Sequence, residues 1–325
     1  MPPLPRPRRP TRPGRRAATS RATIVVLGDL MLDVVLAPSG ALRSGTDVPG
    51  RVSLVQGGSA ATTARWLARL GARSTLIAAV GRDPAGRALV AAVRADGVRP
   101  QVTRVPAART GRIGVVLAPG GERSFVADRA AADLITPDGL RAEWFAGTDA
   151  LHLPVYSLLG DPLGAAGRRA VELARGAGAA VSVDLASIGP LLAGGRRAAR
   201  ALIADIAPDL LFATAAEAGA FLGGRPLDAL LDVAATAVVK RGPKGATILT
   251  RLGPSPTRIE VATEQLAVTD STGAGDAFDA GFLVGWFAAR ASGRSLPASL
   301  QRAALLGHRT AARQLTGDRP ELPLG

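Results

Sequence analysis

Short apolar runs alternate with Ala- and Leu-rich segments along most of this chain, and this alternation constrains the fold more than any other feature. The runs that we predict as strands are Thr23–Leu27, Ser74–Val80, Ala180–Asp184, Leu210–Ala213, Ala235–Lys240 and Ala246–Thr250. The segments that we predict as helices are Ser59–Leu70, Ala85–Asp96, Pro162–Arg175, Arg196–Ile206, Gly275–Arg290 and Pro297–Leu315. Continuous apolar strands separated by helices are typical of a parallel sheet that is covered on both faces. We therefore predict an α/β fold with a mainly parallel sheet.

Residues 34–54 and 109–127 break this alternation, because they contain strand-like runs and turn residues without a helix. In the second stretch, Pro119-Gly120-Gly121 separates the runs Ile113–Leu117 and Arg123–Ala127, which is the pattern of a hairpin. We expect a small antiparallel flap joined to the α/β core. Arg129, just after the hairpin, is expected to be a solvated loop residue.

The composition excludes several kinds of chemistry. The chain has 325 residues, no Cys and only two His, so disulfides and thiol catalysis are excluded and a zinc site is disfavoured. No apolar run reaches the roughly 20 residues that a bilayer requires, and no charged-then-apolar leader opens the chain. We expect a cytoplasmic protein without a membrane partner.

Half of the formal net charge of +14 lies in residues 1–21, which hold seven arginines, several prolines and no acid. This composition predicts a disordered Arg/Pro-rich tail, followed by one folded domain over residues 22–325. The tail is either an arm for nucleic acid or anionic lipid or an inert extension. Its lack of aromatic residues for base stacking favours the inert extension, so we expect no nucleic-acid partner.

The strongest chemical signal is the segment from Asp270 to Phe278 (DSTGAGDAF), where polar residues and two glycines lead into an apolar helical stretch. Backbone N–H groups converge at such a helix start, and the helix dipole adds about half a positive charge there, so the segment can bind an anion. Asp276, in the first turn, has two interpretations. It stabilises the helix start as a charge partner, or it takes the proton from an attacking hydroxyl in phosphoryl transfer.

The same segment resembles the C-terminal signature of the ribokinase-like (PfkB) family of carbohydrate and nucleoside kinases. The residues that resemble the N-terminal signature are Gly57-Gly58-Ser59-Ala60-Ala61, Leu67-Ala68-Arg69-Leu70-Gly71 and Val80-Gly81-Arg82-Asp83, with Gly86 and Gly97. The resemblance covers about residues 22–318, with both signatures in order. It implies a ribokinase-like three-layer α/β/α fold with a mainly parallel central sheet, and a small β-lid formed by residues 34–54 and 109–127. It also favours the catalytic interpretation of Asp276.

The resemblance further implies a role for individual residues. Asp276 corresponds to the catalytic base, and the residues that correspond to the anion hole are Gly273, Ala274 and Gly275. The positions that hold substrate in the family are here Asp33, Gly57, Gly58 and Thr62. Carboxylates accept hydrogen bonds from vicinal diols, and glycines let the backbone approach closely, which suits Asp33 and the glycine pair to this task.

The resemblance implies ATP and Mg²⁺ as cofactors, with a monovalent cation such as K⁺ as a further candidate. The residues that it places near the nucleotide and its phosphates are Thr214, Lys240, Gly242, Lys244, Gly245 and Thr272. Glu217 matches the acid of an Asn-x-x-Glu motif that organises Mg²⁺, an ion that usually keeps several of its waters.

Two positions depart from the family pattern. Thr62 stands where the family has an Asn that contacts substrate, which leaves the identity of the sugar open. Thr214 stands where the family has the Asn of Asn-x-x-Glu, and threonine lacks the amide donor. We therefore expect a weaker affinity for metal or phosphate than is usual in the family.

These observations predict an ATP- and Mg²⁺-dependent kinase that phosphorylates a hydroxyl, expected to be primary, of a sugar, sugar acid or related small molecule. A nucleoside acceptor is an alternative that the aromatic content of 3% disfavours. A second alternative is a catalytically weak protein with the kinase fold that senses a sugar or binds nucleic acid through its tail. The family also suggests a homodimer formed through the lid, and the oligomeric state stays open.

Overall fold

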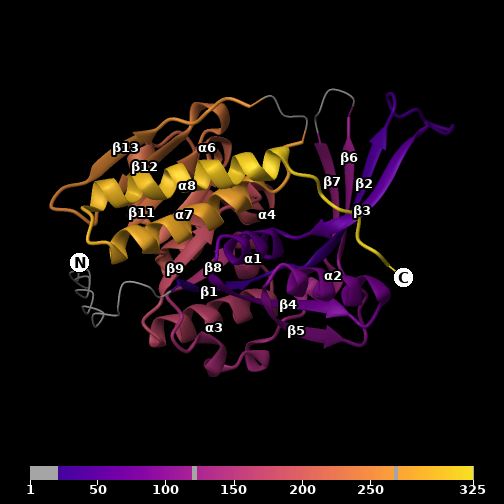
Figure 1. The fold of residues 1–325 in the computed structure, drawn as a ribbon, viewed down its shortest axis with the longest axis horizontal. Helices are drawn as coiled ribbons and strands as arrows, with labels where there is room; N and C mark the ends of the chain where they lie inside the picture. Colours follow the sequence, from indigo (N-terminus) through magenta and orange to yellow (C-terminus); the bar gives the residue numbers. More distant parts are fainter. Residues whose placement is uncertain (1–20, 119–122, 267–269, 325) are drawn as a thin grey trace.

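The computed structural model describes residues 21–118, 123–266 and 270–324, which form a large sheet with helices on both faces and a smaller lid sheet (Figure 1). The predicted tail over residues 1–21 lies outside the described residues except for Arg21. The predicted turn Pro119-Gly120-Gly121 also lies outside them.

The large sheet has nine strands in the order β13-β12-β11-β10-β9-β8-β1-β4-β5. In chain order they are β1 (Thr23–Leu27), β4 (Arg73–Gly81), β5 (Arg99–Val105), β8 (Ala150–Pro154), β9 (Ala180–Asp184), β10 (Leu210–Thr214), β11 (Thr236–Lys240), β12 (Ala246–Thr250) and β13 (Thr257–Val261). The strands from β5 to β11 are parallel, and β12 and β13 add an antiparallel end. This confirms the predicted α/β fold with a mainly parallel sheet.

Helices cover both faces of this sheet. The α-helices are α1 (Ser59–Arg69), α2 (Pro84–Ala95), α3 (Leu163–Gly176), α4 (Ile188–Leu192), α5 (Gly195–Ile206), α6 (Ala215–Leu222), α7 (Ala274–Ala291) and α8 (Leu296–Thr316). Short 3₁₀ helices are η1 (Ala130–Asp133), η2 (Pro137–Gly139), η3 (Ala142–Phe145), η4 (Val155–Leu158), η5 (Leu227–Asp232) and η6 (Gly242–Lys244).

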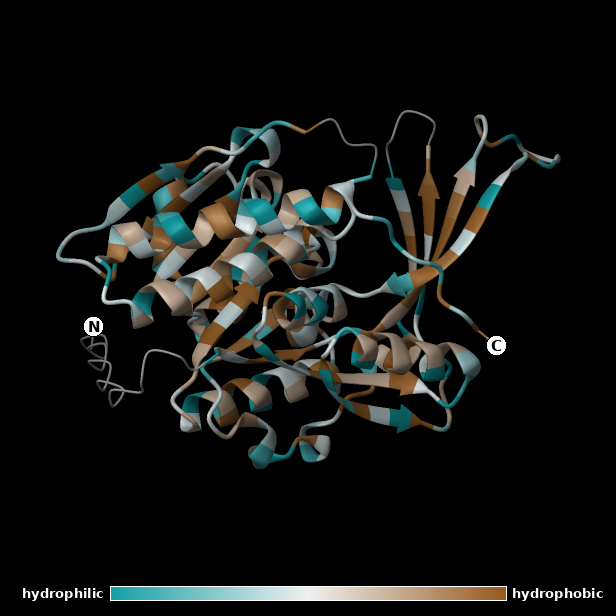
Figure 2. Cartoon of the chain, viewed as in Figure 1, coloured by the Kyte–Doolittle hydropathy of each residue, from teal (hydrophilic) through white to brown (hydrophobic). Residues whose placement is uncertain are grey.

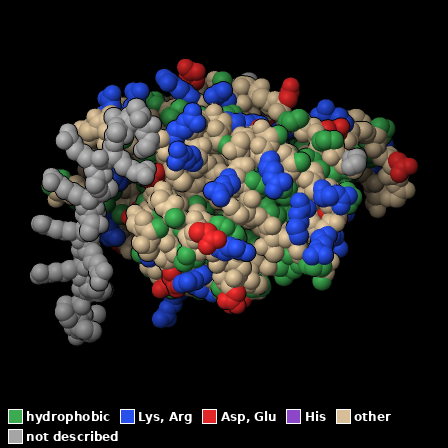
Figure 3. Space-filling view, turned by 60° about the horizontal axis from the view of Figure 1, so that its bottom comes forward, with side chains coloured by type: hydrophobic (Ala, Val, Ile, Leu, Met, Phe, Trp, Pro, Cys, Tyr) green, Lys and Arg blue, Asp and Glu red, His purple; other side chains and the backbone are tan. Residues whose placement is uncertain are grey.

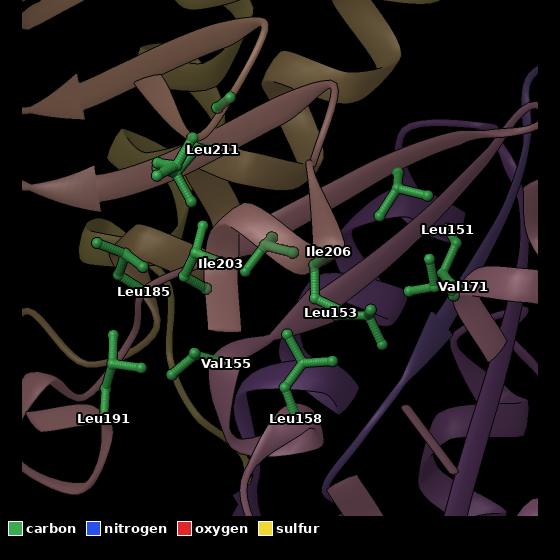
Figure 4. Packing of buried hydrophobic residues seen from close by; sticks show 14 of the residues in the cluster. Leu151, Leu153, Val155, Leu158, Val171, Leu185, Leu191, Ile203, Ile206 and Leu211 are labelled. Carbon is green, nitrogen blue, oxygen red and sulfur yellow. The ribbon is translucent and has the colours of Figure 1, made fainter. Parts of the chain in front are cut away.

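Two buried apolar clusters join the helices to the sheet, one on each face. Alternate residues of β1 serve different faces: Val25 and Leu27 pack with α3 to α6, whereas Ile24 and Val26 pack with α1, α2, α7 and α8. Figure 4 shows part of the first cluster, where Leu153 and Leu211 of the sheet lie with Ile203 of α5. Burial on both faces explains why these strands read as continuous apolar runs in the sequence.

The lid is a four-stranded sheet in the order β3-β2-β6-β7. Its strands are β2 (Met31–Pro38), β3 (Gly50–Gly57), β6 (Arg112–Leu117) and β7 (Arg123–Asp128). The predicted hairpin is present as the antiparallel pair β6 and β7. The expectation of a purely antiparallel flap was wrong, because β2 pairs with β6 in parallel and the lid sheet is therefore mixed. Apolar segments run along the lid strands where they project from the large sheet (Figure 2), and Val52, Phe125 and Val126 are each more than half exposed.

This arrangement brings the carboxyl ends of the parallel strands, the base of the lid and the start of α7 to one place. Ligands of open α/β sheets bind beyond the carboxyl ends of the strands, so the fold points to this region as the site. Among the described residues, no helix is both long and apolar enough to span a bilayer.

Candidate active site

A cleft of about 430 Å³ lies between the lid and the carboxyl ends of the strands. Among its lining residues are Ile113 and Phe125 of the lid, Asp184 and Lys240 at strand ends, and Gly275 and Asp276 at the start of α7. The cleft therefore brings together segments that are more than 150 residues apart in the sequence.

The first turn of α7 leaves two backbone N–H groups without a hydrogen-bond partner among the described residues. Gly273 caps the helix with a φ of 76°, a left-handed conformation that glycine adopts without strain. The first bond of the helix joins Ala277 N to Gly273 O at 2.9 Å, and Ala274 N donates to Ser271 O at 3.3 Å. The N–H groups of Gly275 and Asp276 remain, and both residues line the cleft. Ala274, predicted to be part of the anion hole, has its own N–H engaged by Ser271.

The side chain of Asp276 is held at this helix start by Ser59 of α1, whose hydroxyl donates to Oδ1. Burial raises the pKa of Asp276 to about 7; the Ser59 hydrogen bond opposes this shift, and the charge of Asp184 adds to it. A carboxyl group with this pKa accepts a proton near neutral pH, which is the property of a general base.

A buried lysine with two carboxylates lies directly behind the start of α7. Lys240 Nζ is 3.1 Å from Asp184 Oδ2 and 3.0 Å from Asp279 Oδ1. A Cβ placed on Gly275 would be 3.3 Å from the same Nζ, so the ammonium sits beneath the first turn of α7. Burial raises the pKa of Asp279 and the nearby Asp184 adds to it. Burial also acts to raise the pKa of Asp184, but the charge of Lys240 together with hydrogen bonds to Asp279 and Lys240 outweighs it, and the pKa of Asp184 falls.

Thr214 and Glu217 form a capping box at the start of α6. Thr214 N donates to Glu217 Oε2 at 2.7 Å, and Glu217 N donates to Thr214 Oγ1 at 3.2 Å. Both residues also line the cleft. Burial and the charge of Asp184 raise the pKa of Glu217, which means that the surrounding protein leaves its negative charge only partly compensated.

Asp33 lies inside β2, where the lid meets the large sheet. A Cβ on Gly57 would lie 1.8 Å from Asp33 Oδ1, so only glycine leaves room for this carboxylate. Arg319 Nη2 donates to Asp33 Oδ2 at 2.7 Å. The Asp33 side chain is only 6% exposed, and its other oxygen, Oδ1, is buried without a hydrogen-bond partner among the described residues. A buried acceptor without a partner is costly, and a ligand hydroxyl at this point would satisfy it.

Gly58 and Thr62 line the cleft between Asp33 and the start of α7. Thr62 Oγ1 donates to Gly58 O at 3.0 Å, so its hydroxyl is engaged within α1. Its methyl group faces Gly273, where a Cβ would be 3.2 Å away. Thr62 therefore presents an apolar surface where the family pattern has an amide.

Arg123 of the lid strand β7 contacts the loop that precedes α7. Its Nη1 donates to Thr272 Oγ1 at 2.5 Å and to Asp270 Oδ1 at 3.3 Å, and its Nη2 donates to Ser271 Oγ at 2.7 Å. Thr272 also donates to Asp270, so its hydroxyl is engaged on both sides. These bonds tie the lid to the loop that precedes α7, across the cleft.

Three residues predicted near the nucleotide do not line this cleft. Gly242 and Lys244 lie in the exposed helix η6 after β11. Gly245 packs against β13, where a Cβ would be 2.0 Å from Val261 O. Their predicted role at the nucleotide has no support from the cleft geometry.

The expectation that Arg129 is solvated was wrong. Its side chain is only 16% exposed, it pairs with Asp29 at 3.3 Å and with Asp133 at 2.6 Å, and its guanidinium stacks on Tyr156. Asp29 is itself 3% exposed, and a buried carboxylate requires a cation beside it. Arg129 therefore supports the wall of the cleft formed by Asp29 and Tyr156.

A model of the pfkB family of carbohydrate kinases matches residues 21–321, nearly the whole chain. The chain belongs to this family. This pfkB chain is 30% identical to a fructokinase of Solanum tuberosum over 271 residues, which are 81% of this chain and 80% of that protein. Its identity to fructokinase-2 of Solanum habrochaites is 33% over 170 residues, which are 51% of either protein. The protein is therefore a kinase.

Solved structures share the fold of this pfkB kinase. The adenosine kinase of Sinorhizobium meliloti superposes with a TM-score of 0.78 at 23% identity, covering 94% of this chain and 98% of that one. A putative ribokinase II from E. coli, solved in complex with ATP and Mg²⁺, has a TM-score of 0.75 at 21% identity and covers 92% and 94%. These likenesses confirm the predicted ribokinase-like α/β architecture.

Several polar residues in this pfkB kinase were missed by the sequence analysis. Ser59, Arg123, Asp184 and Arg319 line the cleft, and Asp279 lies buried behind it as a partner of Lys240. Asp184 ends a predicted buried strand and Asp279 follows Asp276 by one helical turn, so both carried a local signal that could have found them. Arg123 and Arg319 carried none, because their partners are about 147 and 286 residues away along the chain.

Proposed function

We propose that this pfkB kinase transfers the terminal phosphoryl group of ATP to a hydroxyl of a small sugar, with Asp276 as the general base. The observation that carries the proposal is the Asp276 carboxyl group, with a pKa of about 7, in the same helical turn as two N–H groups without helical partners. Such N–H groups are suited to stabilising a transferring phosphoryl group, and the carboxylate is suited to taking the proton of the attacking hydroxyl.

The charges around Asp33 support an uncharged, hydroxyl-rich acceptor. Both guanidinium groups at this end of the cleft are already paired, Arg319 with Asp33 and Arg123 with Asp270. Asp276 adds a negative charge when it is ionised, so the carboxylate of a sugar acid would meet repulsion. A neutral sugar avoids it, and one of its hydroxyls can donate to Asp33 Oδ1. The fructokinases among the relatives make fructose the first acceptor to test.

In this proposal, Asp33 and the backbone at Gly57 and Gly58 orient the acceptor so that one hydroxyl, expected to be primary, faces Asp276. Asp276 accepts the hydroxyl proton as the oxygen bonds to the terminal phosphorus and the bond to the departing ADP oxygen breaks. The N–H groups of Gly275 and Asp276 offset the charge on the transferring group, and Lys240 supports that turn from below.

The residues fit a nucleotide with Mg²⁺. The described residues contain no group of three or more acidic or histidine side chains that could hold a metal by themselves. A single carboxylate suits Mg²⁺, which keeps several waters and takes phosphate oxygens as ligands. Glu217 is the proposed carboxylate, because the capping box uses Oε2 and leaves Oε1. When bound, Mg²⁺ would offset the charge of the phosphates, and Thr214 would hold Glu217 in place. Whether the kinase also needs K⁺ is tested by replacing K⁺ with Na⁺ in the activity assay.

A nucleoside is the second candidate acceptor. Although aromatic residues are rare in the chain, Phe125 of the lid and Tyr156 both line the cleft, and their rings could hold a base. One of the proteins that share the fold, from Sinorhizobium meliloti, is an adenosine kinase, which is in keeping with this candidate.

The decisive experiment is ATP turnover with fructose, ribose, gluconate and adenosine as acceptors, with the Asp276→Asn protein as a control for contaminating kinases. We expect fructose or ribose to have the highest kcat/KM. The kcat/KM for gluconate should be at least about tenfold lower, because a tenfold loss corresponds to about 1.4 kcal/mol, the size of one unfavourable charge contact. Adenosine as the best acceptor would establish the nucleoside alternative. No turnover above that of the control would favour a sugar sensor with the kinase fold.

We also propose that two copies associate through the lid. The exposed apolar residues Leu36, Val52 and Val126 support this. Their positions in the lid strands place them on one face, opposite the face on which Phe125 lines the cleft, and large apolar side chains grouped on one surface favour association. Size-exclusion chromatography of the wild type and of a Val126→Lys variant tests it, with a shift to the monomer volume expected in the variant. A cytoplasmic location stays a prediction.

A further inference from the structure

We infer that Arg319, in the segment that follows α8, is a positioning residue of the acceptor site that fixes the orientation of Asp33. This inference rests on the proposed function and adds a residue that lies outside both family signatures. Arg319 Nη2 donates to Asp33 Oδ2 at 2.7 Å and to Gln56 O at 3.1 Å. It therefore joins the acceptor carboxylate in β2 to the backbone of the neighbouring strand β3.

The bond to Arg319 determines which oxygen of Asp33 is available. Oδ2 is occupied by the guanidinium, whereas Oδ1 is buried, without a partner among the described residues, and lies on the side of Gly57. Rotation of the carboxylate would break the contact with Arg319, so the guanidinium keeps Oδ1 as the oxygen that faces the acceptor. Charge-assisted bonds of this kind restrict geometry more than neutral ones do.

Arg319 also supplies the only positive charge in direct contact with Asp33 among the described residues. The other charged groups that affect Asp33 are the carboxylates Asp29 and Asp270, and both repel it. Burial raises the pKa of Asp33 and Arg319 opposes that shift. Without Arg319, the carboxylate would stand buried among like charges, which favours its protonation or its displacement.

The position of Arg319 is fixed by the docking of the C-terminal segment on the lid. Glu321 forms an antiparallel bridge with Val55 of β3, and Leu322 N donates to Leu54 O at 2.7 Å. Leu322 is 8% exposed and belongs to the apolar cluster that contains α1 and α8. Figure 1 shows this segment, in yellow, leaving α8 and running along the base of the lid.

Arg319 has donors left for the acceptor itself. It lines the cleft, and no described residue accepts a hydrogen bond from its Nε or Nη1. A carboxylate oxygen that accepts and a guanidinium that donates, side by side, match two hydroxyl groups of one sugar. The geometry thus points to Asp33 and Arg319 as a pair that recognises a polyol.

The test compares Arg319→Ala and Arg319→Lys with Arg302→Ala, which removes an exposed arginine of α8 away from the cleft. With the best sugar of the acceptor series, we expect Arg319→Ala to lower kcat/KM for the acceptor by about 10- to 150-fold, the range of a lost charged hydrogen bond. The KM for ATP should stay within about twofold of the wild type. Arg319→Lys should recover part of the loss, because it keeps the charge and loses the planar fork.

A second measurement does not depend on turnover. Arg319→Ala should lower the melting temperature at pH 7.5, because it leaves a buried carboxylate unpaired, and Asp33→Asn in the same chain should restore most of that loss. Unchanged acceptor kinetics in Arg319→Ala, or an equal loss for acceptor and ATP, would overturn the inference while the proposed function stands. Absence of turnover in the wild type would overturn the proposed function and this inference with it.

Discussion

The carboxyl group of Asp276 is subject to opposing influences. Burial raises its pKa to about 7, whereas the hydrogen bond from Ser59 pulls the pKa down. In the proposed mechanism Asp276 must be ionised to act as the general base, so its protonation should remove activity. We therefore expect kcat/KM to fall as the pH drops below about 7. This fall, the acid limb of the pH profile, should lie at a pH far above the ordinary pKa of an aspartate.

Removal of the Ser59 hydroxyl tests whether Asp276 sets that limb. In Ser59→Ala, the carboxylate loses a donor that stabilises its charged form, so its pKa should rise and the acid limb should move to higher pH. The matched control is Thr63→Val, because the Thr63 hydroxyl contacts only the backbone oxygen of Asp276, at 3.5 Å. A limb that stays in place in Ser59→Ala, measured from pH 5 to 9, would show that another group controls the profile.

At the scale of single elements, the carboxyl ends of β9 and β11 and the first turns of α7 are held together by the buried group of Asp184, Lys240 and Asp279. Two carboxylates share one ammonium, and the raised pKa of Asp279 indicates that it holds a proton more readily than Asp184 does. The group holds the first turns of α7 in place against the carboxyl ends of the strands.

Lys240→Met should therefore destabilise the protein. The variant leaves two buried carboxylates without a cation, which typically costs about 3–5 kcal/mol in the free energy of unfolding. Asp279→Asn alone should cost much less, and adding it to Lys240→Met should recover part of the loss. Urea denaturation of the three variants measures these values. A loss below about 1 kcal/mol in Lys240→Met would mean that water or a neighbouring group replaces the ammonium.

Strands, helices and site residues could be predicted where the sequence pattern that indicates them lies within one short stretch of the chain. The strands β1 and β9 are buried on both faces and read as apolar runs, whereas the edge strands β5 and β13 mix arginines with apolar residues and gave no such run. In the site, the glycine-rich start of α7 is contiguous and was found. Arg319 was not, since its role comes from a segment that folds back onto β3. Arg129 was misplaced because the burial of Asp29 is a tertiary property.

For the whole molecule, the positive charge is spread widely. Figure 3 shows basic side chains scattered over the visible face, with fewer acidic ones among them. The tail adds seven arginines in residues 1–21, ahead of β1, which starts at Thr23. The cleft, in contrast, pairs its cations with carboxylates, so the overall charge of +14 says little about the acceptor.

Deletion of residues 1–21 should leave the kinase intact. The deletion ends before β1, whose first residue, Thr23, is anchored by a bond from its N–H to Asp149 Oδ2 at 2.8 Å. We expect the melting temperature and kcat to match those of the full chain, measured by calorimetry and by ADP release. A drop of several degrees, or a large loss of kcat, would show that the tail contributes to the folded domain.

The most direct test of the central claim, that Asp276 is the base, is kcat and the melting temperature of Asp276→Asn measured together at pH 8. Asparagine keeps the size of the side chain and removes the base, so kcat should fall by about 10²- to 10⁴-fold. The folded-state pKa of about 7 lies above the usual 3.8, so the stability linked to this group is lost as the pH rises through 7. The asparagine variant should therefore melt at the same temperature as the wild type or higher. A stable variant that keeps more than about a tenth of the wild-type kcat would contradict the account.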